Sequence, residues 1–212
     1  MGFKSFVGPV AATVLALFVA VGQAAADPVR IVAFGDSLMA GYGLSPGESF
    51  PERLEAALKA RGHDVVIANA GVSGDTSSAG LARLDWSVPD DTDLVVLGLG
   101  ANDMLRGVAP DVTRTNLDAM LAALDRRQVD VLLVGMLAAP NLGAAYGEAF
   151  DAIYPDLAEA YGVPLYPFFL DGVTAQAAML LEDGMHPNAA GIDRMVEGVL
   201  PVLEPLVEGL QG

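Results

Sequence analysis

The chain has 212 residues, a formal net charge of −16 at pH 7 and no cysteine. The length fits one domain of ordinary size, and the lack of cysteine excludes disulfides, thiol nucleophiles, cysteine metal sites and a lipidated N-terminal cysteine. The acidity disfavours stable binding to nucleic acid or anionic lipid headgroups, so an uncharged or cationic small-molecule substrate suits the surface better. The simpler interpretation of the acidity is that the negative charge keeps the protein soluble.

The first 26 residues have the layout of a secretory signal peptide. "MGFK" carries one positive charge, a long apolar run follows, and an Ala-x-Ala site ends at Ala26. The alternative is an uncleaved membrane anchor, because the apolar run approaches the ~18 residues that a span needs. Pro9 and the Ala-x-Ala site favour cleavage. We therefore expect residues 27–212 to form a single domain that is exported, to the periplasm or beyond.

Short apolar runs then alternate with helical patterns. The strand-length runs, rich in Val, Ile and Leu, lie at 29–34, 64–70, 93–100 and 129–136, with a weaker fifth at 162–169. Such continuous apolar strands are expected where both faces of a sheet are covered. Helical patterns lie at 49–62, 109–127, 147–162 and 186–210. The alternation predicts a three-layer α/β/α fold with a flavodoxin-like, doubly wound, five-stranded parallel sheet.

Polar residues gather where the first three predicted strands end. "GDS" occupies 35–37, "SGDT" occupies 73–76 and "AND" occupies 101–103. In open α/β sheets, ligands bind outside the carboxyl ends of the strands. The sequence therefore predicts the functional site at this edge of the sheet.

The chain has only two histidines, which restricts the choice of a general base. His63 follows a predicted helix at the opposite edge of the sheet, and we interpret it as a surface turn residue. His186 lies in "EDGMHPNAAG", three residues after Asp183. A carboxylate at that spacing can fold back and hold the imidazole in one tautomer, as a base for serine requires. The alternative is that Asp183 only forms a turn and His186 only caps the helix beginning near Pro187.

Ser37 is the candidate nucleophile because it follows the first strand and opens into a helix. Serine is unreactive without a base close by, and the alternative is an N-cap serine with no chemistry. Ester hydrolysis also builds negative charge on the carbonyl oxygen, which needs hydrogen-bond donors. The backbone N–H of Gly74 and the side-chain amide of Asn102 could supply them from the same edge, although each residue alone also fits an ordinary turn.

Other chemistries have weaker support in the sequence. It contains no G-x-S-x-G elbow, dinucleotide fingerprint or phosphate-binding P-loop. A hard-metal site could be assembled from the carboxylates and imidazole of Asp36, Asp75, Asp103 and His186. One histidine with scattered aspartates is a weak signal for such a site.

Four sequence blocks together carry a resemblance to a known family. "FGDSLMAGYG", "ANAGVSGDTSSAGLARL", "LGLGAND" and "DGMHPNAAG" occur in this order. They resemble the blocks of the SGNH-hydrolase (GDSL-type lipase/esterase) family, and most closely its bacterial periplasmic thioesterases, lysophospholipases and arylesterases. The resemblance covers nearly all of residues 27–212. One departure is Ala101, because the residue before Asn102 is often a second glycine in the family.

The resemblance implies a serine esterase acting on carboxylic esters, and on thioesters, through an acyl-enzyme on Ser37. His186 would be the base and Asp183 its orienting partner. The Ser37 N–H, the Gly74 N–H and the Asn102 side chain would form the oxyanion hole. No metal or organic cofactor is implied.

The resemblance further implies structural roles for Asp36 and Asp103, through hydrogen bonds to nearby backbone N–H groups. These two carboxylates are therefore not assigned to catalysis.

The substrate is the least determined part of the prediction. The apolar loop after the fourth strand suggests an acyl-chain groove, lined by Met39, Leu105, Leu142, Tyr146 and Met185. Ordinary packing is the alternative for each of these residues. We expect medium-chain acyl esters, including lysophospholipids and aryl esters, hydrolysed by a monomer. A carbohydrate O-acetylesterase and a catalytically silent cell-envelope binding protein on the same fold are the alternatives.

Overall fold

A computed structural model describes residues 1, 2, 4 and 27–212. The predicted signal peptide therefore lies almost wholly outside the described residues. Within the described part of the chain, no helix is long and apolar enough to cross a membrane.

The strands form one parallel five-stranded sheet in the order β2-β1-β3-β4-β5. This is the order of flavodoxin-like doubly wound sheets, and it confirms the predicted fold class. The strands are β1 (Val29–Gly35), β2 (Val65–Gly71), β3 (Leu94–Gly98), β4 (Asp130–Val134) and the two-residue β5 (Leu165–Tyr166).

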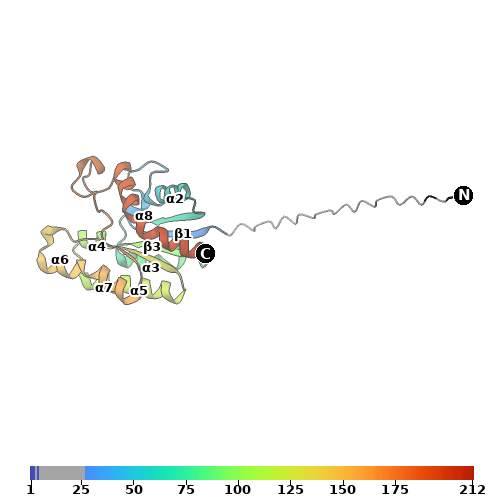
Figure 1. Ribbon diagram of the computed structural model, residues 1–212. Helices are drawn as coiled ribbons and strands as arrows, with labels where there is room; N and C mark the ends of the chain where they lie inside the picture. Colours follow the sequence, from blue (N-terminus) through green and yellow to red (C-terminus); the bar gives the residue numbers. More distant parts are fainter. Residues whose placement is uncertain (3, 5–26) are drawn as a thin grey trace.

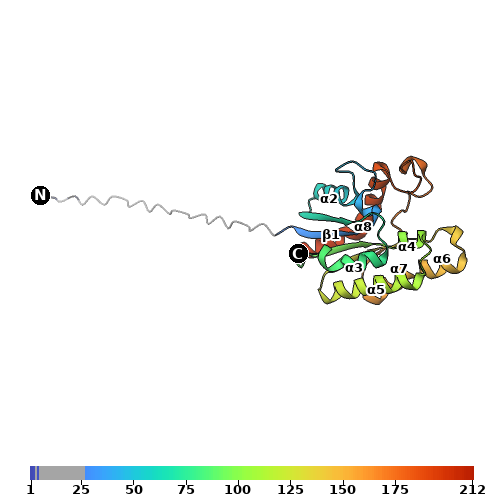
Figure 2. The same cartoon turned by 180° about the vertical axis from the view of Figure 1, so that it is seen from behind.

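Helices cover both faces of the sheet (Figures 1 and 2). On one face α2 (Phe50–Ala60) packs beside α8 (Ala189–Gln211). On the other, α5 (Pro110–Arg126) lies between α3 (Ser77–Ser87) and α7 (Ile153–Tyr161). The inner strands β1, β3 and β4 are therefore almost completely buried. The edge strand β2 is only partly buried, and its Val66 is half-exposed.

One helix differs from the sequence prediction. The single helix expected over 147–162 is divided at Ala152 into α6 (Ala144–Asp151) and α7. Helix α8 agrees with the pattern predicted over 186–210 and continues past Pro201 and Pro205. Both prolines lie on its exposed face, where water can bond the carbonyl oxygens that each proline leaves without an N–H partner.

Short helices follow the strand ends. They are α1 (Ser37–Ala40), α4 (Ala101–Leu105), η1 (Pro140–Leu142) and η2 (Ala177–Met179). The longer α3 was not predicted. Its buried positions are Ser77, Gly80, Arg83 and Leu84, so it lacks the apolar periodicity by which an amphipathic helix is identified.

The register of the sheet sets the level at which the functional segments begin. Gly35, the last residue of β1, pairs with Gly71 at the end of β2 and with Gly98 at the end of β3. Because parallel strands point the same way, the three segments that follow these glycines leave the sheet side by side. They contain Ser37, Gly74 and Asn102.

The start of α2 is fixed by a carboxylate that bonds the residues before it. Glu52 accepts hydrogen bonds from the Ser49 N–H (3.1 Å), the Ser49 hydroxyl (2.6 Å) and the Gly47 N–H (3.0 Å). These donors belong to the N-terminus of the helix, where a carboxylate is also favoured by the helix dipole. The hydroxyl bond lowers the pKa of Glu52.

We expect Glu52→Ala to lower the free energy of unfolding by about 1 kcal/mol at pH 7, as loss of a capping interaction does. Because the pKa of Glu52 is lowered on folding, its contribution is present above the usual glutamate pKa and is lost as the pH falls. Lys59→Ala, on the same helix, removes an exposed pair with Glu55 and should cost less than about 0.5 kcal/mol. Urea unfolding measures both, and equal losses would contradict the prediction.

Candidate active site

Ser37 occupies the first position of α1, directly after the turn that ends β1. The N-cap of this helix is Asp36, whose carboxylate accepts a hydrogen bond from the Leu38 N–H (3.1 Å). The interpretation of Ser37 as an N-cap is therefore wrong, because Asp36 has that role. The Ser37 hydroxyl oxygen lies instead 2.9 Å from His186 Nε2.

Asp183 and His186 belong to one short loop that bonds to itself. One carboxylate oxygen of Asp183 lies 2.6 Å from His186 Nδ1, and the other accepts from the N–H groups of Met185 (2.9 Å) and His186 (3.0 Å). The His186 backbone bond and the ring contact lower the pKa of Asp183 to about 2. Helix α8 is capped by Asn188, which accepts from the Gly191 N–H (3.1 Å), so His186 does not cap it.

Gly74 and Asn102 meet Ser37 and His186 around one cavity. Gly74 has a φ of +88°, a left-handed conformation that glycine adopts without a steric cost. Within the described part of the chain, the backbone N–H groups of Ser37 and Gly74 donate no hydrogen bond. The Asn102 amide nitrogen lies 3.3 Å from a carboxylate oxygen of Asp36, which orients the amide. Donors from three strand ends therefore border the same space.

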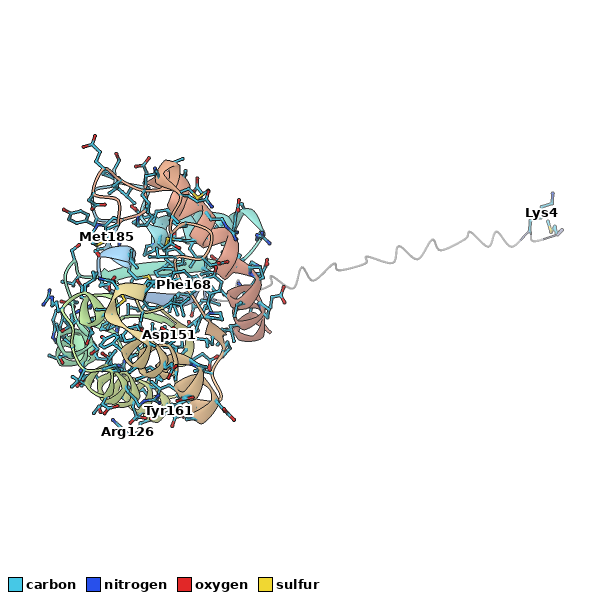
Figure 3. The ribbon with its side chains drawn as sticks, turned by 90° about the vertical axis from the view of Figure 1, so that its left-hand side faces the viewer. Lys4, Arg126, Asp151, Tyr161, Phe168 and Met185 are labelled. Carbon is cyan, nitrogen blue, oxygen red and sulfur yellow. The ribbon has the colours of Figure 1, made fainter. Side chains whose placement is uncertain are left out.

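The cavity has a volume of about 410 Å³, in the range of small-molecule sites. Leu105 and Met185 lie at its mouth, 53% and 48% exposed, and Figure 3 shows Met185 at the surface of the molecule. Most of the walls are apolar, which suits the hydrocarbon part of a substrate. The apolar lining comprises Leu38, Tyr42, Ala101, Met104, Leu105, Met136, Leu170 and Met185.

Three residues predicted for the acyl groove do not line this cavity. Leu142 and Tyr146 are not among the lining residues but pack against the hydrophobic core. The Tyr146 hydroxyl donates to the Val108 carbonyl (2.8 Å). Met39 is fully buried beneath the site. The loop after β4 contributes Met136 to the cavity instead.

Tyr42 and Arg106 are among the residues near the site that the sequence analysis missed. The ring of Tyr42 lies 4.4 Å from the His186 ring between centroids, tilted by 34°, and so covers one side of the imidazole. Arg106 donates from Nη2 to the Gly74 carbonyl (2.7 Å). Glycines flank Tyr42 in the sequence and signal a turn, but no spacing rule connects it with a histidine so far along the chain.

The aspartates of the alternative metal site are occupied by other contacts. Asp103 is fully buried and accepts from the Ser77 N–H (2.7 Å) and the Ser77 hydroxyl (2.5 Å). Asp75 pairs with Arg83 at 2.6 Å, and Asp36 bonds as described above. Among the described residues, these side chains and His186 do not form a group with converging ligand atoms. The hydrogen bonds of Asp36 and Asp103 agree with the structural roles that the resemblance implies.

The opposite edge of the sheet contains His63 and a second hollow. His63 is more enclosed than expected of a surface turn residue, because its ring nitrogens contact Glu204 (3.0 Å) and Gln211 (3.1 Å) of α8. The Glu204 contact raises the pKa of His63. The hollow, of about 550 Å³, is larger than the cavity at Ser37 but is lined by no serine or histidine. We therefore place the candidate active site at Ser37.

Residues 33–194 match the model of the GDSL-like Lipase/Acylhydrolase family. The chain belongs to this family. It is 40% identical to "Esterase TesA" of Pseudomonas aeruginosa, over 91% of this chain and 96% of that protein. It is 37% identical to "Thioesterase 1/protease 1/lysophospholipase L1" of Escherichia coli K12, over 87% and 86% of the two chains. The crystal structure of AlinE4, "a SGNH-hydrolase family esterase", superposes with a TM-score of 0.72 at 46% identity, covering 85% and 97%.

The family and these relatives make the protein a serine esterase of the SGNH type. The resemblance found in the sequence is therefore confirmed at the level of family and reaction class. Each of the four GDSL family blocks contributes residues to the cavity. The first three do so from the ends of β1, β2 and β3, and the fourth from the loop before α8.

Asp36 is a buried carboxyl group, and burial disfavours its charged form. It is 2% exposed, and burial raises its pKa to about 6 despite the hydrogen bonds from Leu38 and Asn102. A carboxyl group whose pKa is higher in the folded chain than in the unfolded chain loses stabilising free energy as the pH rises between the two values.

Asp36→Asn removes this titration. We therefore expect the free energy of unfolding of the variant, relative to wild type, to be higher at pH 8 than at pH 4, by up to about 3 kcal/mol. Asn102→Ala should have the opposite sign, because it removes a donor that favours the charged carboxylate. Urea unfolding at the two pH values measures both. An Asp36→Asn effect that does not change with pH would contradict this prediction.

Proposed function

We propose that this protein hydrolyses carboxylic esters through an acyl-enzyme on Ser37, with His186 as the general base and Asp183 as its orienting partner. The observation that carries the proposal is a pair of connected hydrogen bonds beside an apolar cavity. Ser37 Oγ lies 2.9 Å from His186 Nε2, and His186 Nδ1 lies 2.6 Å from Asp183. This arrangement supplies the base that a serine nucleophile lacks.

In the first step, Nε2 of His186 takes the hydroxyl proton while Ser37 Oγ attacks the carbonyl carbon of the ester. Asp183, ionised with a pKa of about 2, accepts a hydrogen bond from the Nδ1–H group and stabilises the imidazolium that forms. The imidazolium then gives its proton to the leaving alcohol, and the acyl group remains on Ser37. Water repeats the sequence, with His186 again as base, and releases the carboxylic acid.

The negative charge on the carbonyl oxygen would be held by the N–H groups of Ser37 and Gly74 and by the Asn102 amide. This role is supported by the position of all three residues around one cavity. Donors placed in advance around a developing oxyanion are worth about 3–4 kcal/mol each. The bond from Asn102 to Asp36 holds the amide so that its remaining N–H is available to the substrate.

The apolar cavity supports a substrate with a hydrocarbon acyl chain, of medium length, entering beside Leu105 and Met185. The names of the relatives include a thioesterase and a lysophospholipase, and we extend the proposal to thioesters and lysophospholipids on that basis. The same mechanism serves a thioester, because only the leaving group changes.

We further propose that residues 1–26 are a signal peptide, removed after Ala26, and that residues 27–212 are the exported, periplasmic esterase domain, acting as a monomer. The charged start, apolar run and Ala-x-Ala site support this. N-terminal sequencing of the protein recovered from the periplasm tests the cleavage point.

Ser37→Ala should abolish labelling by a fluorophosphonate probe and lower kcat/KM for p-nitrophenyl esters by at least about 10⁴-fold. Ser73→Ala is the matched control, because Ser73 is a second serine lining the cavity and should keep its labelling. Labelling that persists in Ser37→Ala, or is lost in Ser73→Ala, would contradict the assignment of the nucleophile.

A series of p-nitrophenyl esters from acetyl to dodecanoyl should show a maximum of kcat/KM at medium chain length. Leu105→Ala should lower the value for octanoyl by about 10-fold, the loss expected for one apolar contact of this size, and leave acetyl unchanged. Val112→Ala, exposed but outside the cavity, should change neither. A preference confined to acetyl would reject the acyl groove and favour an O-acetylesterase.

A further inference from the structure

Arg83, in the middle of α3, is a buried charge outside the cavity. Its side chain is 8% exposed, on the face of the helix that packs against the sheet. Removing a guanidinium group from water is costly unless every donor finds a partner. The contacts of Arg83 therefore indicate its role in the structure.

All three nitrogens of the Arg83 guanidinium donate hydrogen bonds. Nε donates to the Asp75 carboxylate (2.6 Å), Nη2 to the Gly35 carbonyl (2.8 Å) and Nη1 to the Ser87 hydroxyl (3.2 Å). The guanidinium carbon lies 4.0 Å from the centroid of the Phe34 ring, within the range of a cation–π contact. The planar fork of an arginine can reach these partners together, whereas a lysine has a single point charge.

Two of these contacts join the segments that carry the proposed oxyanion donors. Gly35 is two residues before Ser37, and Asp75 directly follows Gly74. The Gly35 carbonyl also accepts from the Val72 N–H (3.0 Å). The turn from Val72 to Asp75 is therefore tied to the end of β1 at both of its ends, once directly and once through Arg83.

We propose that Arg83 is a positioning residue for the oxyanion hole: through Asp75 and Gly35 it fixes the spacing between the Gly74 and Ser37 N–H groups. The inference rests on the proposed function. A purely structural role is the competing explanation, but a buried ion pair alone is weak grounds for stability, because apolar residues often replace one without loss. The placement of this pair between two donor segments favours positioning.

The two explanations differ in their kinetic consequences. An oxyanion exists in the transition state and not in the bound ester, so displacing its donors lowers kcat and leaves KM unchanged. A displacement of about 1 Å in an active site can cost about 10²-fold in rate. Loss of stability alone changes the fraction of folded enzyme and leaves the kinetics of the folded molecules unaltered.

The experiment compares Arg83→Gln, Arg83→Lys, Asp75→Asn and the double variant Arg83→Gln/Asp75→Asn in the full protein. We expect Arg83→Gln and Asp75→Asn each to lower kcat by about 10–100-fold with KM within about twofold. The double variant should lose no more than the more impaired single variant, because both act through one contact. Arg83→Lys should not restore kcat.

Binding of an alkyl trifluoromethyl ketone supplies a second readout. Ser37 Oγ adds to its carbonyl carbon, the hydroxyl proton passes to His186, and the adduct holds an oxyanion where the transition state does. Its affinity should fall in Arg83→Gln by the same factor as kcat. Arg127→Gln is the matched control, because Arg127 is partly buried and donates to the Val88 and Pro89 carbonyls at the end of α3.

Arg127→Gln should lower the melting temperature without changing kcat or ketone affinity. The proposal is overturned if Arg83→Gln or Asp75→Asn behaves in the same way, or if kcat falls while ketone affinity is unchanged. Should Arg83→Gln fail to fold, Arg83→Lys and Asp75→Asn decide the matter. Failure of the proposed function is distinguishable, because wild type would then neither turn over esters nor form the ketone adduct.

Discussion

The pairing of Gly35 with Gly71 on one side and Gly98 on the other is the constraint on which the candidate site depends. A β-carbon at Gly35 would collide with the Gly98 carbonyl and with Met39, and one at Gly71 would collide with the backbone of Ala40. Glycine therefore permits the chain to turn tightly over the strand ends. Ser37, Gly74 and Asn102 then stand at one level over the sheet, although the sequence separates them widely.

Around these strand ends the protein buries polar and charged side chains in place of apolar ones. Asp36, Arg83 and Asp103 are each less than 10% exposed, and each is bonded to a segment that borders the cavity. Such groups cost free energy of desolvation, which for Asp36 is visible as a raised pKa. The apolar core elsewhere includes the fully buried Phe34, Leu97 and Leu117. Its stability offsets the cost of burying polar groups that orient the segments around the cavity.

The sequence predicted the fold and the central pair of the site because both depend on local signals. Continuous apolar runs identified the strands, and the spacing of Asp183 and His186 allowed a loop that bonds to itself. Helix α3 escaped detection because Ser77, Gly80 and Arg83 fill its buried face, and an arginine is ordinarily taken as a solvent-exposed residue. Two of the partners of Arg83, Gly35 and Asp75, could not be identified from spacing, since they lie outside α3.

For a similar reason, the sequence did not indicate which apolar residues line the cavity. Leu142 and Tyr146 have the composition of a pocket wall, but composition does not distinguish the inner from the outer side of a loop. In the structure the Tyr146 hydroxyl bonds to Val108 and the ring stacks on Phe150, 5.8 Å between centroids. Tyr42 shows the converse, since only the folded chain brings it to His186.

The loop from Leu181 to His186 closes on itself, with the Leu181 N–H donating to the His186 carbonyl (2.8 Å) and Asp183 bonding both the backbone and the ring of His186. The candidate site therefore consists of two parts: a sheet edge carrying Ser37 and a loop carrying His186 already paired with Asp183. The hydrogen bond that joins the two parts, between Ser37 Oγ and His186 Nε2, is 2.9 Å long. Sliding the loop as a unit would separate His186 from Ser37 while leaving intact the contact with Asp183 that holds the tautomer of His186.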